Sequence, residues 1–323
     1  MGRRRVFKTQ SDDAGRRVDV VCRKLLPGIS LGQIHKAIRK GDIRLEGKKT
    51  TPEERLSEGN AVEIYEPLIL KSNKLPARKP TSSKRPRRLE KLALSSLIVR
   101  QTPHLIIFNK PRGLLVHGPA SLDAMVKSKM SSNSLSFQPG PLHRLDQNTS
   151  GLVVFSKSLQ GAQVFSQLLK SGQLEKTYLA ILRGTLRTPT ECTAPLLKDE
   201  KVGIVKVDPS GLAAVTRFVP IHTQNNLSLV LCFPKTGRTH QIRVHAREIE
   251  HPLAGDGKYD GGELEGGFVL HAWRLRYPEQ AWEALGQSPL LAELPTQSLK
   301  SILQNLQLNA EHFKALLAKW ANR

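Results

Sequence analysis

The sequence predicts an α+β protein with a mixed, mainly antiparallel sheet and flanking helices, preceded by a small α/β module. From about residue 96, strand-like apolar runs alternate with helical patterns, and most connections are short and contain Pro or Gly. Short connections favour antiparallel pairing, because parallel strands need long crossovers. With 323 residues, 39% of them hydrophobic, the chain can bury a core in about two domains.

Changes of composition along the chain predict four segments. They are an N-terminal module (1–70), a basic Pro- and Ser-rich linker (71–95), the main α+β unit (96–280) and a helical C-terminal extension (281–323). Within the linker, residues 71–91 hold nine Lys or Arg against Glu90 alone. Its prolines exclude a core element, so we expect a flexible segment that can grip a polyanion. A self-repelling spacer without a partner is the alternative.

The N-terminal module shows two amphipathic helical patterns. Val18, Val21, Leu25 and Leu26 form one apolar stripe, which ends at Pro27-Gly28. Ser30 can cap a second helix that Gly41 closes, and short strands are expected at 43–45 and 61–65. The apolar side of the second helix consists of Ile34, Ala37 and Ile38. Its outer side is basic and suited to a phosphate backbone, with Lys36, Arg39 and Lys40.

In the main unit, apolar runs predict six strands and the periodic segments predict helices. The strands are expected at 105–108, 152–155, 177–182, 214–219, 227–233 and 268–275. Helices are expected at about 159–170 and 238–249, and again through the leucine-rich tail at 287–321.

Charge is the main compositional signal. Fifty Lys and Arg against 28 Asp and Glu give a net charge of +22, which indicates a polyanionic partner, with nucleic acid as the first candidate. A merely solvated basic surface is the alternative. An anionic membrane is less favoured, because no basic amphipathic helix with an aromatic face stands out.

Cellular location and redox state follow from what the sequence does not contain. No apolar run is long enough for a membrane helix, and no signal-peptide pattern follows the basic N-terminus. Cys22, Cys192 and Cys232 lie far apart, so neither a disulfide framework nor a zinc ribbon is expected. We expect a cytoplasmic, reduced protein.

The densest polar cluster is HRLDQNTSGL at 143–152, directly before a predicted strand. Arg144 next to Asp146 would keep the carboxylate ionised, and such a carboxylate can act as a nucleophile or a base. Thr149 and Ser150 can fix the loop through bonds to its own backbone. A structural Asp–Arg pair in a turn remains the alternative reading of these residues.

Two further clusters accompany it. In GRTHQIRVH (237–245), a helix could aim Arg243 at an acidic loop while Arg238 and His240 meet phosphate or sugar; a solvated basic helix is the alternative. NKPRGLLVH (109–117), which includes Lys110, is expected to form a strand, a tight turn and a second strand.

Competing chemistries find little support. His240, His245 and His251 do not stack on one helix face and lack a completing Cys or carboxylate set, so no metal site is expected. The chain has no phosphate-binding G-x-x-x-x-G-K-[ST] loop, no dinucleotide fingerprint and no G-x-S-x-G elbow. We therefore expect no ATP, no NAD and no serine-hydrolase mechanism.

These clusters, in this order, resemble the RluA-type family of RNA pseudouridine synthases, in its RluC/RluD-like branch. The resemblance runs from about 99 to 278, with residues 143–152 as the catalytic signature. The accompanying motifs are NKPRGLLVH, EKTYLA (175–180), GRTHQIRVH, HPLAGD (251–256) and LHA (270–272). The N-terminal module resembles the alpha-L RNA-binding fold through GRRVD (15–19), the helix at 30–40, GDIRL (41–45) and GNAVE (59–63).

The resemblance implies that uridine within RNA is isomerised to pseudouridine without a cofactor or a metal. Asp146 would be the essential carboxylate, which attacks the base, attacks the sugar or removes a sugar proton; these three alternatives stay open. Tyr178 would stack on the base and assist proton removal at C5, and Arg243 would pair with Asp146. Arg144 would hold the RNA around a flipped-out base. The implied substrate-binding residues are Arg144, His143, Thr149, Lys110, Arg238, His240 and Leu270. The implied RNA-binding residues are Lys36, Arg39, Lys40, Lys84, Arg85, Arg87 and Arg88.

We expect large-subunit ribosomal RNA as the substrate, free or in a subunit precursor, and a monomeric enzyme. The basis is the extra RNA-binding module with its basic linker. The alternatives are a transfer-RNA pseudouridine synthase, a non-catalytic RNA-binding assembly factor and a basic DNA-binding protein. The sequence departs from the family pattern at Gln147-Asn148, Ser156 and Leu212, which weakens inference about the substrate.

Overall fold

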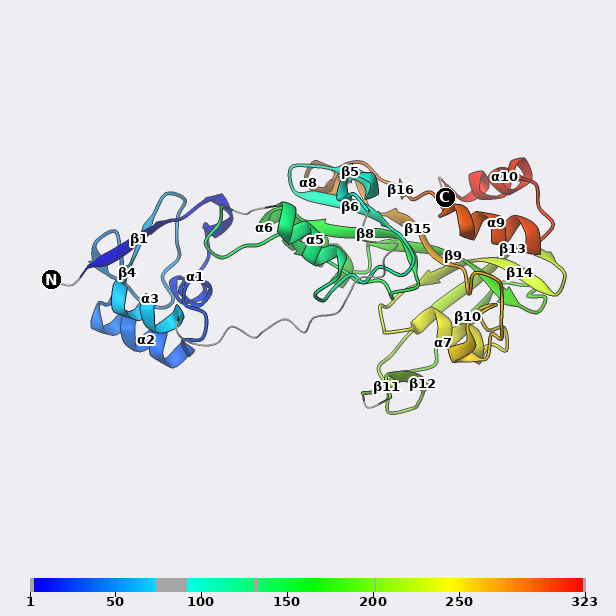
Figure 1. Ribbon diagram of the computed structural model, residues 1–323, viewed down its shortest axis with the longest axis horizontal. Coiled ribbons are helices and arrows are strands. Elements are labelled where there is room, and N and C mark those ends of the chain that lie inside the picture. The colour runs from blue at the N-terminus through cyan, green and yellow to red at the C-terminus, as the bar shows by residue number, and fades with distance from the viewer. Residues whose placement is uncertain (1–2, 74–91, 131–132, 201, 322–323) are drawn as a thin grey trace.

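The computed structural model describes residues 3–73, 92–130, 133–200 and 202–321. Figure 1 shows a small N-terminal module beside a larger unit built on one extended sheet. Lys84, Arg85, Arg87 and Arg88 of the basic linker lie outside the described residues.

The N-terminal module is a four-stranded antiparallel sheet covered by helices. Its strand order is β1-β4-β2-β3, and its core contains side chains of α1 and α2. The strands are β1 (Arg4–Lys8), β2 (Ile43–Leu45), β3 (Lys48–Lys49) and β4 (Ala61–Tyr65), and the helices are η1 (Ser11–Asp13), α1 (Val18–Leu25), α2 (Leu31–Lys40) and α3 (Glu66–Asn73).

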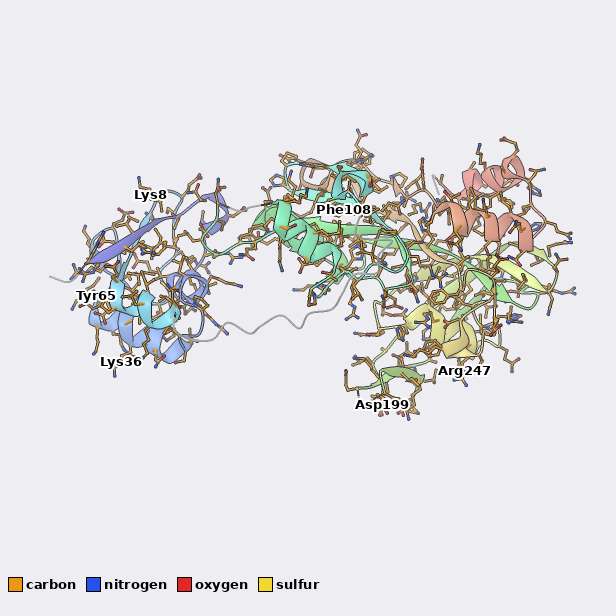
Figure 2. All side chains as sticks on the ribbon, in the orientation of Figure 1. Lys8, Lys36, Tyr65, Phe108, Asp199 and Arg247 are labelled. Atoms are coloured by element: carbon orange, nitrogen blue, oxygen red, sulfur yellow. The ribbon has the colours of Figure 1, made fainter. Side chains whose placement is uncertain are left out.

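Helix α2 forms as its sequence predicts. Ser30 caps its first turn by accepting a hydrogen bond from the Gln33 amide, and Gly41 ends it in the left-handed conformation at φ 80°. Its apolar side is buried in the module core. Lys36, Arg39 and Lys40 are exposed, and Figure 2 shows Lys36 at the outer side of the module.

The large sheet has the order β10-β13-β14-β9-β15-β8-β6-β5, with β16 beside β15 and β7 beside β8. Every pairing in it is antiparallel except β15 with β8, so the predicted mixed, mainly antiparallel sheet is confirmed. The strands are β5 (Ile98–Gln101), β6 (Leu105–Lys110), β7 (Gly140–Pro141), β8 (Ser150–Ser156), β9 (Glu175–Arg183), β10 (Thr190–Cys192), β13 (Thr216–Gln224), β14 (Leu227–Pro234), β15 (Leu270–Arg276) and β16 (Leu290–Leu291).

Side chains of the central strands are buried on both faces of the sheet. Along β8, Leu152 and Val154 pack in the cluster that holds α6 (Leu159–Lys170), whereas Val153 and Phe155 pack in the cluster that holds α5 (Leu122–Lys129). A strand buried on both faces needs an unbroken apolar run, and this explains the run at 152–155. Helix α7 (Gln241–Glu248) covers part of β9, β13 and β14.

Gly151 is required where β8 meets β15. Its φ is 109°, and a Cβ atom there would collide with the backbone of Ala272, its partner in the parallel pairing. Only glycine combines this conformation with such a close approach. The loop that ends at Ser150 is therefore held directly against β15.

Three local predictions are wrong. The helix expected from 287 begins only at Thr296, because Leu290–Leu291 form β16 beside β15. The second strand expected within 109–117 is absent, and Leu115 makes only an isolated bridge to Ser121, because the Lys110 ammonium collects the carbonyls of Pro111 and Leu114 and closes the chain into a turn. The helix expected from 238 begins at Gln241, so His240 belongs to the preceding loop with φ 52°.

The C-terminal residues pack on the large unit. The elements are η4 (Glu279–Ala281), α8 (Trp282–Leu285), α9 (Thr296–Asn305) and α10 (Ala310–Ala321). Ile302, Leu306 and Phe313 are buried against β9 and β14. In Figure 1, α9 and α10 lie over the end of the sheet that carries β13 and β14.

Three smaller elements complete the fold. They are η2 (Leu94–Leu97), η3 (Gly257–Tyr259) and a separate two-stranded hairpin of β11 (Leu196–Asp199) and β12 (Ile204–Val207), which projects from the large unit in Figure 1. Within the described ranges, no helix is long and apolar enough to cross a membrane.

Candidate active site

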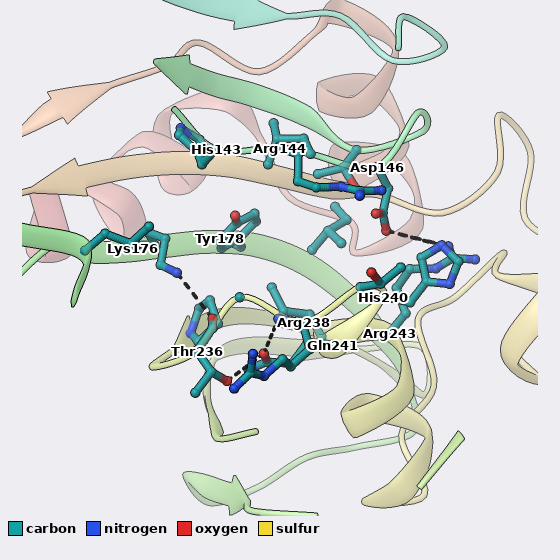
Figure 3. Close-up of a pocket in the computed structure, with 18 of the residues that line it drawn as sticks. His143, Arg144, Asp146, Lys176, Tyr178, Thr236, Arg238, His240, Gln241 and Arg243 are labelled. Atoms are coloured by element: carbon teal, nitrogen blue, oxygen red, sulfur yellow. Dashed lines mark hydrogen bonds and ion pairs between the residues drawn. The ribbon is translucent and has the colours of Figure 1, made fainter. Parts of the chain in front are cut away.

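A pocket of about 250 Å³ opens beside the loop at 142–149. Its walls come from that loop, from β9, from the loop at 234–240 with the start of α7, and from the first residue of β15. Figure 3 shows Asp146, Tyr178 and Arg243 from three of these segments facing the same space. The first two sequence clusters thus meet in one site.

The loop around Asp146 is fixed by backbone hydrogen bonds. The Thr149 amide donates to the Asp146 carbonyl at 3.1 Å, and the Gly113 amide donates to the Gln147 carbonyl at 2.8 Å. The third predicted cluster therefore supports the loop from behind. The Asp146 side chain keeps 20% exposure, enough to meet a ligand.

Lys110 lies differently from its predicted place in substrate binding. It is fully buried, and its ammonium donates to the carbonyls of Pro111, Leu114 and Gln147 at 2.8–3.1 Å. Burial lowers the pKa of Lys110 to about 7, although the charge of Asp146 opposes the shift. Lys110 therefore stabilises the loop that carries Asp146, because its ammonium donates to three carbonyls inside the protein.

Arg243 is clamped mainly by a residue that the sequence analysis did not select. Its Nε and Nη2 donate to both carboxylate oxygens of Asp256 at 2.6 and 2.7 Å. Its Nη1 lies 3.7 Å from Oδ2 of Asp146, which is a looser ion pair. Burial alone would lower the pKa of Arg243, but the bonds to Asp256 outweigh it and raise that pKa.

Two rings complete the seat of Arg243. Its guanidinium lies 4.8 Å from the ring centre of Tyr259 and 4.9 Å from that of Phe268. Asp256 belongs to the HPLAGD motif, but only the folded chain reveals that it is the partner of Arg243, 13 residues away.

His240 also approaches Asp146. Its Nε2 lies 3.8 Å from Oδ2 of Asp146, and its Nδ1 lies 2.6 Å from the hydroxyl of Tyr259. Burial lowers the pKa of His240; the charge of Asp146 opposes this shift and that of Arg243 adds to it. The ring is therefore uncharged at neutral pH. Its expected contact with phosphate or sugar stays a prediction.

Other predicted residues line the pocket as expected. Tyr178 lies on β9, Leu270 on β15, and Arg144 and Arg238 lie at the exposed rim. Burial, reinforced by Asp146, raises the pKa of Tyr178 above its ordinary value, so the phenol keeps its proton at neutral pH. The hydroxyl of Thr149 is buried, and no partner for it occurs among the described residues.

His143 lines the pocket, and its ring also makes structural contacts. Its Nε2 accepts a hydrogen bond from the Val154 amide at 3.1 Å, and its ring stacks on Phe165 with 5.8 Å between the ring centres. Burial lowers the pKa of His143 to about 4, with Lys176 adding to the shift.

Gln241 shapes the opposite wall, and the sequence analysis did not select it. Its carbonyl oxygen accepts from the Thr236 hydroxyl and the Arg238 amide, while its amide nitrogen donates to the Val215 carbonyl and the Thr216 hydroxyl. A buried amide with all its bonds satisfied holds the loop at 236–240 in one shape.

In the part of the chain that the structure describes, no three His, Cys, Asp or Glu side chains gather as metal ligands. The site presents a carboxylate, a clamped guanidinium and a half-buried phenol around an apolar floor. This arrangement suits a reaction in which a carboxylate attacks or takes a proton from a flat, polar substrate.

Comparison with known proteins gives one consistent result. Residues 104–248 match the family described as RNA pseudouridylate synthase. Ribosomal large subunit pseudouridine synthase C of Vibrio vulnificus (strain CMCP6) is 30% identical over 318 residues, covering 94% of this chain and 96% of that protein. The protein of the same name from Vibrio cholerae serotype O1 is 34% identical over 289 residues, covering 84% of this chain and 88% of its own length.

A solved structure shares the fold. Human RNA Pseudouridylate Synthase Domain Containing 4 matches with a TM-score of 0.53 and 24% identity, covering 67% of this chain and 95% of that chain.

Proposed function

Because the chain belongs to the RNA pseudouridylate synthase family, we propose that it converts uridines of large-subunit ribosomal RNA to pseudouridines. The relatives that match over most of both chains carry the name ribosomal large subunit pseudouridine synthase C. The single observation that carries the proposal is the carboxylate of Asp146 at the mouth of a pocket, 3.7 Å from a clamped Arg243.

The reaction exchanges bonds within one nucleotide. The bond between ribose C1′ and base N1 breaks, C1′ bonds to C5 of the rotated base, C5 loses its proton and N1 gains one. Atoms and electrons balance without a co-reactant. The chain therefore has to supply positioning, a carboxylate and a route for one proton.

Asp146 takes the central role. Arg243 and His240 both approach its Oδ2, and we assign the contact with the substrate to Oδ1. A positive charge at this distance attracts the carboxylate and orients it. Attack on the sugar, attack on the base and removal of a sugar proton are all compatible with this geometry.

Tyr178 and Leu270 hold the base. Both lie in the pocket wall, and a flat pyrimidine would fit against the phenol ring and the leucine side chain. Because the raised pKa keeps the phenol protonated, Tyr178 acts by stacking and as a hydrogen-bond donor, not as a phenolate base. The unpaired hydroxyl of Thr149 offers a second hydrogen bond to the nucleotide.

The rim and the N-terminal module hold the RNA around the base. A target base must leave its stack to reach such a pocket, and the exposed Arg144 and Arg238 can grip the distorted backbone. The exposed cations of α2 and the basic linker at 71–95 add contacts to phosphates farther away. In this division of roles, the module at 1–70 binds RNA and the unit at 96–280 carries out the reaction.

Pseudouridine mapping tests the proposal and its substrate class together. Purified wild type is incubated with unmodified large-subunit ribosomal RNA and with unmodified transfer RNA, without added cofactor. We expect new pseudouridines at a few positions of the ribosomal RNA and none in transfer RNA. If naked RNA stays unmodified, partly assembled large subunits are the next substrate.

The Asp146→Asn variant should form no pseudouridine while its RNA affinity stays near that of wild type. Glu311→Gln is the matched control, because it removes the same charge from an exposed position on α10. Modification of transfer RNA alone would overturn the substrate class. No modification of any of these substrates by wild type would overturn the proposed activity.

A further inference from the structure

A chain of three contacts leads from the β11–β12 hairpin to the carboxylate of Asp146. The Val205 amide of β12 donates to the Tyr259 hydroxyl at 3.2 Å. The same hydroxyl lies 2.6 Å from Nδ1 of His240, whose Nε2 lies 3.8 Å from Oδ2 of Asp146.

The donor and the acceptor in each of the two hydrogen bonds of the Tyr259 hydroxyl follow from the groups involved. A backbone N–H can only donate, so the Tyr259 oxygen is the acceptor from Val205. The hydroxyl has one proton, Tyr259 is 2% exposed, and its remaining close partner among the residues that the structure describes is Nδ1 of His240. The phenol therefore donates to Nδ1, which must be unprotonated.

The single N–H proton of the neutral His240 ring must then be on Nε2. Because the ring is uncharged at neutral pH and Nδ1 accepts, the N–H is at Nε2, the nitrogen that faces Asp146. With the other tautomer, a lone pair would face the carboxylate and repel it. Tyr259 thus determines whether His240 presents an N–H or a lone pair of Nε2 to the Asp146 carboxylate.

The packing holds these groups together. The Tyr259 ring lies edge-on to the His240 ring, with 5.5 Å between centres, and it packs in one small core with Val205 and Val244. Lys258 donates to the Gly203 carbonyl at 2.8 Å, a second contact between the η3 turn and the hairpin. His240 keeps a left-handed backbone at φ 52°, which a non-glycine residue retains only where its surroundings hold it.

We propose that Tyr259 is a positioning residue, which holds His240 as the Nε2–H tautomer so that this N–H is presented to Asp146. The inference deepens the proposed function and rests on it. When substrate closes the 3.8 Å gap, the contact becomes a hydrogen bond that orients the carboxylate opposite Arg243. Since Tyr259 is itself held by β12, the hairpin is part of this support.

The direct test is the tautomer of His240, which does not depend on activity. Protein labelled with ¹⁵N in histidine is studied by NMR at pH 7.5, and the His240→Gln variant identifies the His240 signals by difference. We expect protonated Nε2 and unprotonated Nδ1 in wild type. A protonated Nδ1, alone or together with Nε2, would overturn the proposal even if Tyr259 variants fail to fold.

Kinetics then separate positioning from general stability. Tyr259→Phe should lower kcat about tenfold, the effect of losing one aligned hydrogen bond, with RNA affinity unchanged. Tyr277→Phe is the matched control, because it removes a buried hydroxyl that donates to Leu285 and Gly286 away from the pocket. Its kcat should stay within twofold of wild type.

A double-variant cycle gives the sharpest result. Gln has no tautomers and can offer an amide N–H toward Asp146, so Tyr259→Phe should change kcat less than twofold in the His240→Gln background. An undiminished tenfold effect there, or equal effects of Tyr259→Phe and Tyr277→Phe, would reject the positioning role. An inactive wild type would instead reject the proposed function, and the NMR result would still decide the tautomer.

Discussion

Two ion pairs formed by arginines of α7 differ mainly in burial. Arg243 is buried and binds Asp256, a side chain with 2% exposure, whereas four residues later Arg247 binds Asp260 with both side chains more than half exposed. Breaking a buried pair leaves an unpaired charge in a poorly solvated place, while an exposed pair contributes little. Comparing the two pairs therefore shows how much burial changes the contribution of an Arg–Asp pair to stability.

Asp256→Asn should lower the free energy of unfolding by about 3 kcal/mol and abolish detectable pseudouridine formation, because Arg243 loses its bidentate clamp beside Asp146. Urea unfolding and the mapping assay measure the two effects. Asp260→Asn is the control and should cost less than about 1 kcal/mol. Equal costs for the two variants would contradict the role given to Asp256.

At the residue scale, sequence reasoning identified the groups that face the pocket better than those that support them. Asp146, Tyr178, Arg243 and Leu270 were all predicted, and all four line one pocket. Supporting residues were harder to predict because their partners are distant in the chain. Lys110 was expected to bind substrate, but its ammonium donates to the carbonyl of Gln147, 37 residues away.

At the scale of elements, His271 ties three segments together. It lies fully buried on β15, where its Nδ1 accepts from the Ser150 hydroxyl of β8 at 2.9 Å and its Nε2 donates to the Ala292 carbonyl at 3.2 Å. Burial lowers the pKa of His271 from 6.5 to about 4. Protonation would put a proton on Nδ1 where the Ser150 hydroxyl now donates.

The pH dependence of stability follows from this shift. Between pH 6.5 and 4 the unfolded chain binds a proton that the folded chain does not, so the contribution is complete above pH 6.5 and is lost as the pH falls. At pH 5 the loss from His271 is about 2 kcal/mol. Urea unfolding at pH 7.5 and 5 should show that His271→Gln shrinks the acid loss by about this amount.

The control is His117→Gln, which changes an exposed histidine outside these contacts. It should leave the difference in unfolding free energy between pH 7.5 and 5 as in wild type. An unchanged difference in His271→Gln would mean that another group governs the acid sensitivity.

Elements with a strong period were predicted closely, and those without one were missed. Helix α6 has the predicted bounds, because an apolar stripe and the Ser158 cap mark it. The β11–β12 hairpin was missed, since its strands have four residues each and their buried side chains pack in a small cluster with Ala214, Val244 and Tyr259. Its partners come from other parts of the chain, so no local pattern announces it.

At the scale of the whole molecule, charge separates binding from chemistry. The basic segment at 71–91 has the highest charge density of the chain, and the pocket lies in a different unit. Replacing Lys84, Arg85, Arg87 and Arg88 by Gln should weaken RNA binding at low salt and reduce the slope of log K against log salt by up to about 3, because fewer counterions are released. Filter binding across a salt series measures this slope.

The matched control neutralises four exposed lysines elsewhere: Lys170, Lys300, Lys314 and Lys319. This variant has the same net charge, so it should keep most of the affinity and the slope if the linker grips RNA locally. At saturating RNA both variants should form pseudouridine at the wild-type rate. A linker variant that stops the reaction at saturation would contradict the separation of roles.

The central claim is that the Asp146 carboxylate performs the reaction in the pocket, and tritium release tests it most directly. Large-subunit ribosomal RNA labelled at C5 of uridine is mixed with excess enzyme in a single turnover, and tritium lost to water is counted. Wild type and Glu311→Gln should release tritium in proportion to the pseudouridines formed, and Asp146→Asn should release none while it still binds the RNA. Release by Asp146→Asn at the wild-type rate would contradict the account.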